Sequence, residues 1–310
     1  MLGTLAIIIT LSTMFFAVAL SLTSISLMTL PFLVVAFNVV QWLISPYLID
    51  AMYRVREVSK SENLKLHGIV EKLSEESHIT PPKVMIAQIP IPNAFAYGSP
   101  IAGTRVAVTT ELLKNLEDEE VEAVIGHELG HLKHRDVQIM MFVSILPALF
   151  YYIGYSMLLS ARYSGREERG GGAAIIGIAS LILYWVLTLF TLHLSRLREY
   201  FADRHSATII EEGPRKLSEA LAKIQYTAGR MRRIRRDVNG FNSLKTLFIA
   251  DPDHAEADTI AIAQVRAPIT DQRLVEEVLR KEVTTLDKIA ELFSTHPNIV
   301  KRLRALQELA

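Results

Sequence analysis

The stretch VEAVIGHELGHLKHRDVQIMMFVSILPALF, residues 121–150, joins a polar segment with paired histidines to a long apolar one. In HELGH, His127 and His131 are four residues apart, so a helix places both imidazoles on one face, about one turn apart. Both rings can then reach a single Zn²⁺ ion. Glu128, next to the first histidine, can take a proton from an attacking water instead of binding the metal. The pattern predicts a hydrolytic zinc site on a helix.

The apolar segment that follows is one of three long apolar runs without a charged residue, namely 1–49, 137–161 and 170–195. A helix needs about 20 apolar residues to cross a membrane. The first run is long enough for two crossings and is interrupted by the serines and threonines of SLTSIS (21–26). We therefore expect four transmembrane helices, at about 3–22, 30–49, 137–160 and 174–195.

Basic residues indicate how these spans are oriented, because they concentrate on the cytoplasmic side of a membrane. They follow the second span, precede the third and follow the fourth: Arg54, Arg56, Lys60, Lys133, Arg135, Arg196 and Arg198. This predicts a multi-pass protein of the cell membrane (inner or plasma), with its polar parts cytosolic and the 162–172 loop outside. The N-terminus has no basic segment or cleavage site typical of a secretory signal, so we expect the first span to be retained.

Composition excludes several other classes of site and partner. The chain has 33 basic and 33 acidic residues, which gives no electrostatic reason to expect a nucleic-acid partner. It has no cysteine, which excludes disulfides and thiolate metal sites.

The polar segments predict a cytosolic α+β catalytic domain in two parts, 50–136 and 196–310. The first part has an amphipathic helix at about 58–77, a small hairpin-rich sheet, and then the metal helix, which starts near Asn115 or Asp118. The predicted strands are VMIAQI (84–89), NAFAYG (93–98) and RVAVTT (105–110). The second part is mostly helical, and its last two helices are separated at His296-Pro297. The fold class expected is thus a mainly α membrane protein.

Two residues are candidates for a third metal ligand. His134 is seven residues from His127 and so lies about 10.5 Å from it along the helix axis, too far to share one ion easily. Glu199 lies in LREYFADRHS (197–206), and two antiparallel spans of similar length would return it to the same membrane face as HELGH. Asp203, four residues on, could accept the second ring N–H of a ligand histidine. The alternative for both acids is an ordinary charged helix paired with arginines.

Several motifs together resemble the M48 membrane metallopeptidases, of the HtpX type. They are HELGH, the two apolar spans after it, REYFADRHSA (198–207), PNAFAYG (92–98) and STHPNIVKRL (294–303). The resemblance implies a gluzincin (zincin-like) domain with one Zn²⁺ per chain. It implies that His127, His131 and Glu199 are ligands, with Glu128 as the base and Asp203 in the second shell. The implied substrates are unfolded polypeptides and misfolded or damaged membrane proteins, cut at the cytosolic face in quality control and the stress response.

Further site residues are predicted, each with a plainer alternative. His296 could donate to the oxyanion, supported by Arg302 or Arg304, or could simply lie in the turn before Pro297. Asn93, Ala94 and Phe95 could lie on a strand edge that pairs with the substrate backbone, or in a core strand. The basic cluster Arg230–Arg236 could contact anionic headgroups or be a solvated loop.

Competing functions remain open on the sequence alone. Within the class, the alternative is a CAAX-type prenyl-protein protease, although those relatives have more spans. Outside it, the alternatives are a non-catalytic zinc-binding membrane scaffold and a transporter. Glu128 argues against a scaffold, since a structural zinc site needs no base. A transporter would have ionisable groups within its spans, and these spans have only His193.

Overall fold

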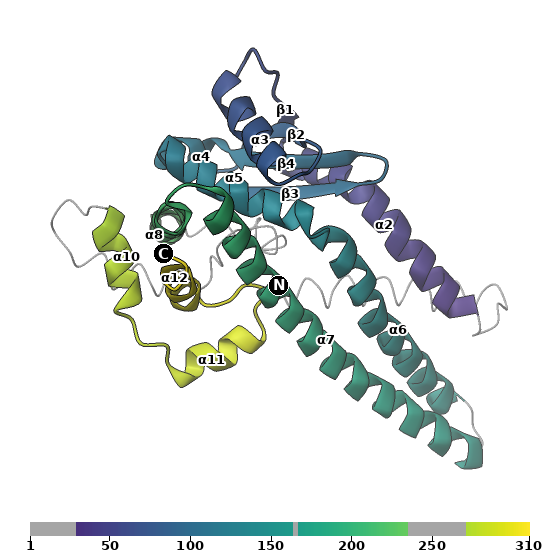
Figure 1. Ribbon diagram of the computed structural model, residues 1–310. Helices are drawn as coiled ribbons and strands as arrows, with labels where there is room; N and C mark the ends of the chain where they lie inside the picture. The colour runs from purple at the N-terminus through teal and green to yellow at the C-terminus, as the bar shows by residue number, and fades with distance from the viewer. Residues whose placement is uncertain (1–28, 164–166, 235–270) are drawn as a thin grey trace. The chain divides into compact units, whose positions relative to one another are not determined.

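The computed structural model describes residues 29–163, 167–234 and 271–310 (Figure 1). The chain forms two compact units. The apolar unit contains the described residues up to Trp42 and Gln138–Leu194, and the polar unit contains Leu43–Val137 and Ser195–Ala310. The predicted first span, at about 3–22, lies outside the described residues.

Among the described residues, three helices are long and apolar enough to cross a membrane. They are α2 (Leu30–Tyr53), α6 (Asp136–Tyr163) and α7 (Glu167–Ile209), and they contain the predicted spans that begin near residues 30, 137 and 174. Their exposed side chains include many large apolar ones, such as Phe32, Phe142 and Phe190. Helices of this kind satisfy their own backbone groups, as a membrane requires.

The fourth predicted span is part of a much longer helix. α7 has 43 residues, about 65 Å, so it is roughly twice as long as the apolar core of a bilayer is thick. The prediction of a loop over residues 162–172 is wrong at both ends, because α6 extends to Tyr163 and α7 begins at Glu167. The segment 197–206 is a direct continuation of this helix, since no glycine or proline interrupts residues 178–212.

Within the apolar unit, α6 and α7 pack closely where each carries a glycine. A Cβ atom added at Gly154 would lie 3.0 Å from the carbonyl oxygen of Gly177, and the converse distance is the same. Nearby, the rings of Tyr151 and Tyr184 meet edge to face, with centroids 5.2 Å apart. Small residues allow helix backbones to approach in this way without a hydrophobic driving force.

The polar unit contains a four-stranded mixed sheet with the strand order β1-β2-β4-β3. Its strands are β1 (Arg56–Glu57), β2 (Lys83–Ala87), β3 (Ala94–Ser99) and β4 (Gly103–Thr109). β3 and β4 form an antiparallel hairpin, whereas β2 runs parallel to β4. Three of these strands match the predicted ones to within two residues. The prediction missed β1, which is too short to show an alternating pattern.

Three helices belong with this sheet: α3 (Leu64–Glu76), α4 (Thr110–Asn115) and α5 (Asp118–Lys133). The predicted helix at about 58–77 begins later, because the side chain of Asn63 caps it by accepting from the backbone N–H of Leu66. The metal helix begins at Asp118, one of its two predicted starts. Its first turn holds three acids and Glu117 completes a capping box, so the helix start is well defined.

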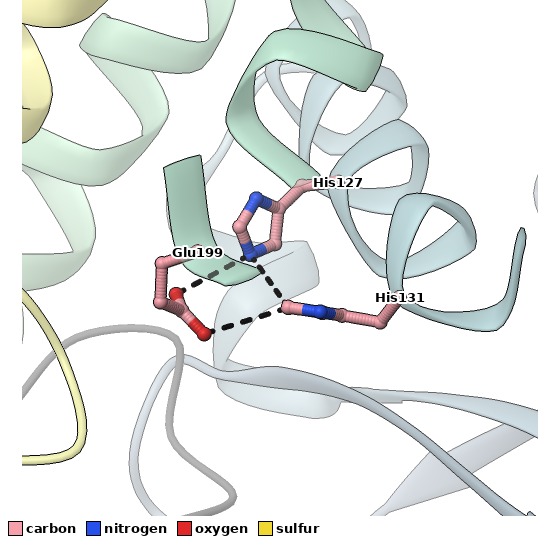
Figure 2. A group of neighbouring side chains, drawn as sticks. All are labelled: His127, His131 and Glu199. Atoms are coloured by element: carbon pink, nitrogen blue, oxygen red, sulfur yellow. Dashed lines mark hydrogen bonds and ion pairs between the residues drawn. The ribbon is translucent and has the colours of Figure 1, made fainter. Parts of the chain in front are cut away.

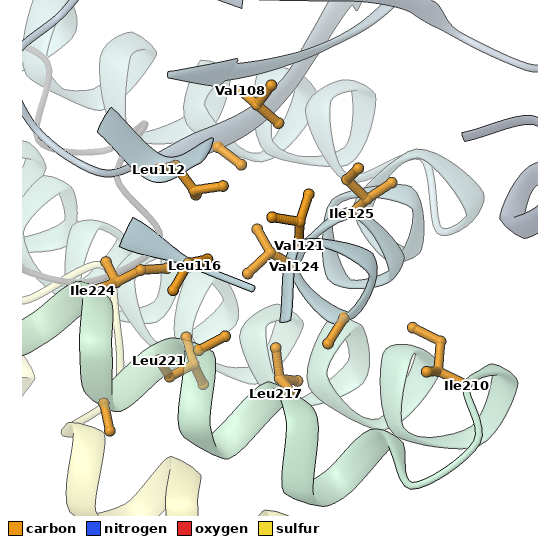
Figure 3. Close-up of a cluster of buried hydrophobic side chains, with 14 of the residues drawn as sticks. Val108, Leu112, Leu116, Val121, Val124, Ile125, Ile210, Leu217, Leu221 and Ile224 are labelled. Carbon is orange, nitrogen blue, oxygen red and sulfur yellow. The ribbon is translucent and has the colours of Figure 1, made fainter. Parts of the chain in front are cut away.

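A hydrophobic core joins α5 to the sheet and to the helices from the second half of the chain (Figure 3). Val121, Val124 and Ile125 of α5 lie between Val108 of β4 and Leu217 at the start of α8. Each buried side chain of this size contributes about 1.5–3 kcal/mol. The core therefore holds the metal helix rigidly.

The second half of the polar unit, beyond α7, is helical. Its described helices are α8 (Gly213–Ile234), α10 (Asp271–Leu279), α11 (Thr285–Leu292) and α12 (Ile299–Gln307). The predicted break at His296-Pro297 lies between α11 and α12. The basic cluster Arg230–Arg236 falls at the end of α8 and largely outside the residues whose side chains are described.

Candidate metal centre

α5 and the polar end of α7 approach closely where α5 carries glycine. A Cβ atom at Gly130 would lie 3.1 Å from the Cα atom of Ala202. One at Gly126 would lie 3.0 Å from the hydroxyl oxygen of Ser206, which donates to the carbonyl oxygen of Ala123 over 2.6 Å. A larger residue at either position would push the helices apart. The two glycines therefore bring the polar end of α7 against the histidines of α5.

Three side chains converge at this contact: His127 and His131 from α5, and Glu199 from α7 (Figure 2). Their ligand atoms all lie within 4.8 Å of one another. The two Nε2 atoms are 3.2 Å apart, and the oxygens of Glu199 lie 3.5 Å from Nε2 of His131 and 3.7 Å from Nε2 of His127. The structure thus brings together the three residues that were predicted as ligands.

The surroundings of the two histidines suit a cation between them. Nδ1 of His127 lies 2.9 Å from Asp203, and Nδ1 of His131 lies 2.6 Å from Asp136. A neutral histidine that directs its ring N–H at a carboxylate leaves its second nitrogen unprotonated. Two such lone pairs and the buried carboxylate of Glu199 then face one another, and they repel unless a positive charge lies among them. The donor set, two imidazoles and a carboxylate, fits Zn²⁺.

Arg302 of α12 neutralises the carboxylates on the His127 side of the site. Its Nε and Nη2 atoms donate to the two carboxylate oxygens of Asp203, over 2.8 and 2.6 Å, and Nη1 lies 3.3 Å from Glu199. Only 1% of Arg302 is exposed. Burial would lower the pKa of Arg302, but the charges of Asp203 and Glu199 raise it above its usual range, so the guanidinium remains charged.

The predicted support of an oxyanion donor by Arg302 or Arg304 does not fit this geometry. Arg302 is directed at two carboxylates. Arg304 is exposed, and its Nη2 atom lies 3.5 and 3.4 Å from the carbonyl oxygens of Leu279 and Lys281. Both guanidinium groups are therefore used elsewhere in the described structure.

Asp136, which was not predicted as a site residue, performs for His131 the role that Asp203 performs for His127. Arg135 has a positive φ of 55°, and this turn between α5 and α6 folds Asp136 back beside His131. Nε of Arg198 lies 3.0 Å from the same carboxylate. Burial would lower the pKa of His131, but the hydrogen bond with Asp136 and the charge of Glu199 raise it. An acid five residues after the second histidine is the sequence signal that could have found it.

Glu128, the predicted base, is buried and held by the sheet. Its Oε2 atom accepts a hydrogen bond from the backbone N–H of Ala96 over 2.7 Å. Ala96 lies in β3, which is an edge strand because it pairs only with β4. The hydrogen bond fixes the carboxylate on the side of α5 that faces the open edge of the sheet.

The side chains of Asn93, Ala94 and Phe95 are buried at the start of β3. Phe95 packs against Tyr53 and Tyr97, with ring centroids 5.6 and 5.4 Å away. Any contact of these residues with a substrate would therefore be made by the backbone of the strand edge. That contact stays a prediction.

His296 lies in the loop between α11 and α12, where it is buried beside the ligand group. Its Nδ1 atom lies 3.3 Å from Oε2 of Glu199. Arg196 of α7 holds this loop, since its Nη1 atom donates to the carbonyl oxygens of Glu291 and Ser294, over 2.7 Å each. The histidine predicted to act on the reacting group is thus adjacent to the metal site.

His134, the alternative third ligand, lies outside the group. It is the C-cap residue of α5, and its ring packs against Phe201 and His205 at centroid distances of 6.1 and 6.0 Å. It is therefore not a member of the ligand group.

Comparison with known proteins identifies the family. The family model described as Peptidase family M48 matches residues 60–310. The Protease HtpX homolog of Aeropyrum pernix is 39% identical over 295 residues, covering 94% of this chain and 88% of that protein. The Protease HtpX homolog of Thermoplasma acidophilum is 36% identical over 289 residues, covering 91% and 86%.

A solved structure shows a similar fold. The crystal structure of Ste24p from S. mikatae matches 89% of this chain with a TM-score of 0.55 and 17% sequence identity. This chain covers 57% of that longer one. The family match, the HtpX relatives and the apolar helices lead to one conclusion: the chain belongs to peptidase family M48 and is a membrane metalloprotease of the HtpX type.

Proposed function

We propose that this protein is a zinc-dependent endopeptidase that cleaves misfolded or damaged membrane proteins, and other unfolded polypeptides, at the cytosolic face of the membrane. The observation that carries the proposal is the convergence of His127, His131 and Glu199 within 4.8 Å, with Glu128 next to the first ligand in the sequence. Quality control of membrane proteins is the cellular role that the resemblance to HtpX-type proteases supports.

In the proposed reaction, His127, His131 and Glu199 would hold one Zn²⁺ ion. When bound there, zinc would supply Lewis-acid polarisation of the scissile carbonyl and would lower the pKa of a bound water. Glu128 accepts the proton of the attacking water and later donates it to the departing amine. The N–H of Ala96 keeps its carboxylate oriented for this transfer.

Two further groups would act on the substrate. The outer edge of β3, apart from the Ala96 N–H that Glu128 already accepts, would pair with the substrate backbone as an added strand and place the scissile bond along α5. His296 would donate to the oxyanion that develops on the carbonyl oxygen. Its proximity to Glu199 supports this role.

The proposed topology has four spans with both ends of the chain in the cytosol of a prokaryotic cell, in the inner or plasma membrane. Residues 1–49 and 137–195 would form the two membrane hairpins. Residues 50–136 and 196–310 would form the catalytic domain. Most basic residues at the ends of the spans support this orientation, because seven of them lie on one side of such an arrangement, whereas Arg162, Arg166 and Arg169 lie on the other.

A catalytic role fits the donor set better than a zinc-binding scaffold does. A structural zinc site usually has four protein ligands, whereas a catalytic site keeps one position for water or substrate. The metal-ligand group found among the described residues has three members. The buried carboxylate of Glu128 adjoins it in sequence but is bonded to the sheet.

The decisive experiment uses Glu128→Gln in the purified, zinc-loaded protein with an unfolded model substrate. The variant should retain zinc, measured by atomic absorption, and lose cleavage. Glu122→Gln, on the same helix and paired with Lys72, is the matched control and should cleave normally. Unchanged cleavage by Glu128→Gln would remove the proposed mechanism.

The ligand assignment has its own test. Glu199→Ala should lower the zinc content of the purified protein, whereas His134→Ala should leave it unchanged. The reverse result would make His134 the third ligand.

A further inference from the structure

Helix α11 carries an apolar face that the described structure leaves exposed. Four large side chains form it, and their exposed fractions are 77% for Leu286, 51% for Ile289, 52% for Leu292 and 42% for Phe293. None of the eight residues of α11 is buried. The positions i, i+3 and i+7 of this set place it along one stripe of the helix. Apolar residues scattered singly on a surface are normal, but three on one short helix and a fourth at its C-cap call for a partner.

The position of α11 in the polar unit points to the kind of partner. The Nη1 atom of Arg196 donates to the carbonyl oxygens of Glu291 and Ser294, at and just beyond the last turn of α11. Arg196 is also the first charged residue after the apolar run 170–195 of α7. The end of α11 therefore lies within one arginine side chain of the point where α7 stops being apolar.

Basic residues that flank a membrane-spanning run lie close to the membrane interface. Arg196 is buried and its guanidinium is bonded to the end of α11, so it links α11 to this part of α7. Exposed apolar side chains continue along α7 after Arg196. Leu197 and Phe201 are 40% and 57% exposed, although charged residues surround them in the sequence. The apolar surface of α7 therefore extends past Arg196, the residue that holds the end of α11.

A second element of the polar unit has the same relation to another apolar helix. Ser99, the last residue of β3, donates its hydroxyl to the carbonyl oxygen of Leu43, in the apolar helix α2. Ile101, in the turn after β3, is 67% exposed.

We propose that α11 is an interfacial helix, with its apolar face (Leu286, Ile289, Leu292 and Phe293) inserted at the boundary between lipid headgroups and acyl chains. Helices of this type lie in the membrane plane and are held by buried apolar area. Attraction to anionic headgroups adds little, because the polar side of α11 carries one lysine against two acids. The partner is the bilayer that already surrounds α7.

This contact would link the lipid surface to the metal site. The loop that follows α11 contains Ser294, whose carbonyl oxygen Arg196 holds, and His296, which lies 3.3 Å from Glu199. Insertion of α11 would fix the end of this loop that is remote from α12.

The absence of cysteine allows a direct test with single-cysteine variants of the full chain. An environment-sensitive fluorophore is attached to Ile289→Cys, and the protein is reconstituted in phosphatidylcholine nanodiscs. Lipids with a nitroxide near the headgroup end of the acyl chain probe lipid contact, and iodide probes water contact. Leu64→Cys on α3 and Arg304→Cys on α12 are the controls, since both positions are exposed.

The label at 289 should show blue-shifted emission and strong quenching by the nitroxide lipid, with weak quenching by iodide. The labels at 64 and 304 should show the opposite. Iodide quenching at 289 equal to that at 64 would overturn the proposal, and so would protection from both quenchers, which would mean that protein covers the face. Leu286→Cys repeats the measurement if the variant at 289 does not fold.

Discussion

The two histidines of the metal centre are held by parallel arrangements that differ in burial and origin. On one side, His127 contacts Asp203, which is paired with Arg302. On the other, His131 contacts Asp136, which is paired with Arg198. Arg302 exposes 1% of its side chain, whereas Arg198 exposes 18%.

The difference in origin matters as much as the difference in burial. Asp203 and Arg302 come from α7 and α12, far along the chain from His127, so their contact requires that the whole polar unit be folded. Asp136 lies five residues after His131, at the junction of α5 and α6. The first arrangement therefore couples metal binding to the global fold, and the second orients one ligand locally.

Substitution of Arg302 should have the largest effect on stability. Arg302→Met removes the charge and leaves the carboxylates of Asp203 and Glu199 buried together without their partner, and a loss of this kind costs about 3–5 kcal/mol. Chemical unfolding of the detergent-solubilised protein, followed by circular dichroism, measures the change. Arg304→Met, on the same helix but exposed, is the control and should change the unfolding free energy by less than about 0.5 kcal/mol. Equal stability of the two variants would show that the buried pair is not important for the fold.

Much of this centre could be predicted from sequence, because its parts have short-range signals. The spacing of His127 and His131 is a property of one helix, and the two spans after them predicted that Glu199 returns to the same place. In the structure, the ligand atoms of these three residues lie within 4.8 Å of one another. The three membrane helices that the structure describes also follow directly from charge-free runs.

The roles of Asp136 and Arg302 could not be predicted in the same way. Asp136 reaches His131 only because the backbone at Arg135 adopts a positive φ. An arginine gives no sequence signal for this conformation, as a glycine would. Arg302 was expected near the oxyanion because the sequence gives its distance from His296 but not the direction of α12. The parallel pairing of β2 with β4 was likewise hidden, since alternation predicts strands and not their order.

Asp203→Asn should have the largest effect on metal affinity among the residues that contact the ligand histidines. The amide cannot balance the charge of Arg302 and accepts the ring N–H of His127 less strongly, and loss of such a partner typically lowers affinity 10- to 100-fold. Competition with a chromogenic zinc chelator measures it. We expect a loss near the upper end of that range, together with lower stability. An unchanged zinc affinity would contradict the role assigned to Asp203.

Asp136→Asn should weaken zinc binding near the lower end of the same range, about ten-fold, because the change is local to His131 and the site is less buried. The unfolding free energy of the zinc-free variant should stay close to that of the unmodified protein, in contrast to Asp203→Asn. If Asp136→Asn destabilised the zinc-free protein as much as Asp203→Asn does, the claim that Asp136 acts only locally would be wrong.

Arg198→Gln should have the smallest effect of the series. Asp136 is buried and keeps its hydrogen bond with His131, whereas the side chain of Arg198 is 18% exposed, so water can partly replace the arginine. Its loss should therefore cost less than the loss of a fully buried partner such as Arg302. The zinc affinity should fall by less than about ten-fold, and the fall should shrink at high salt, which screens an accessible pair. Arg204→Gln, an exposed position on the same helix, should change neither value. A salt-independent loss as large as that of Asp203→Asn would mean that the His131 side is as closed as the His127 side, and the distinction between the two sides would then fail.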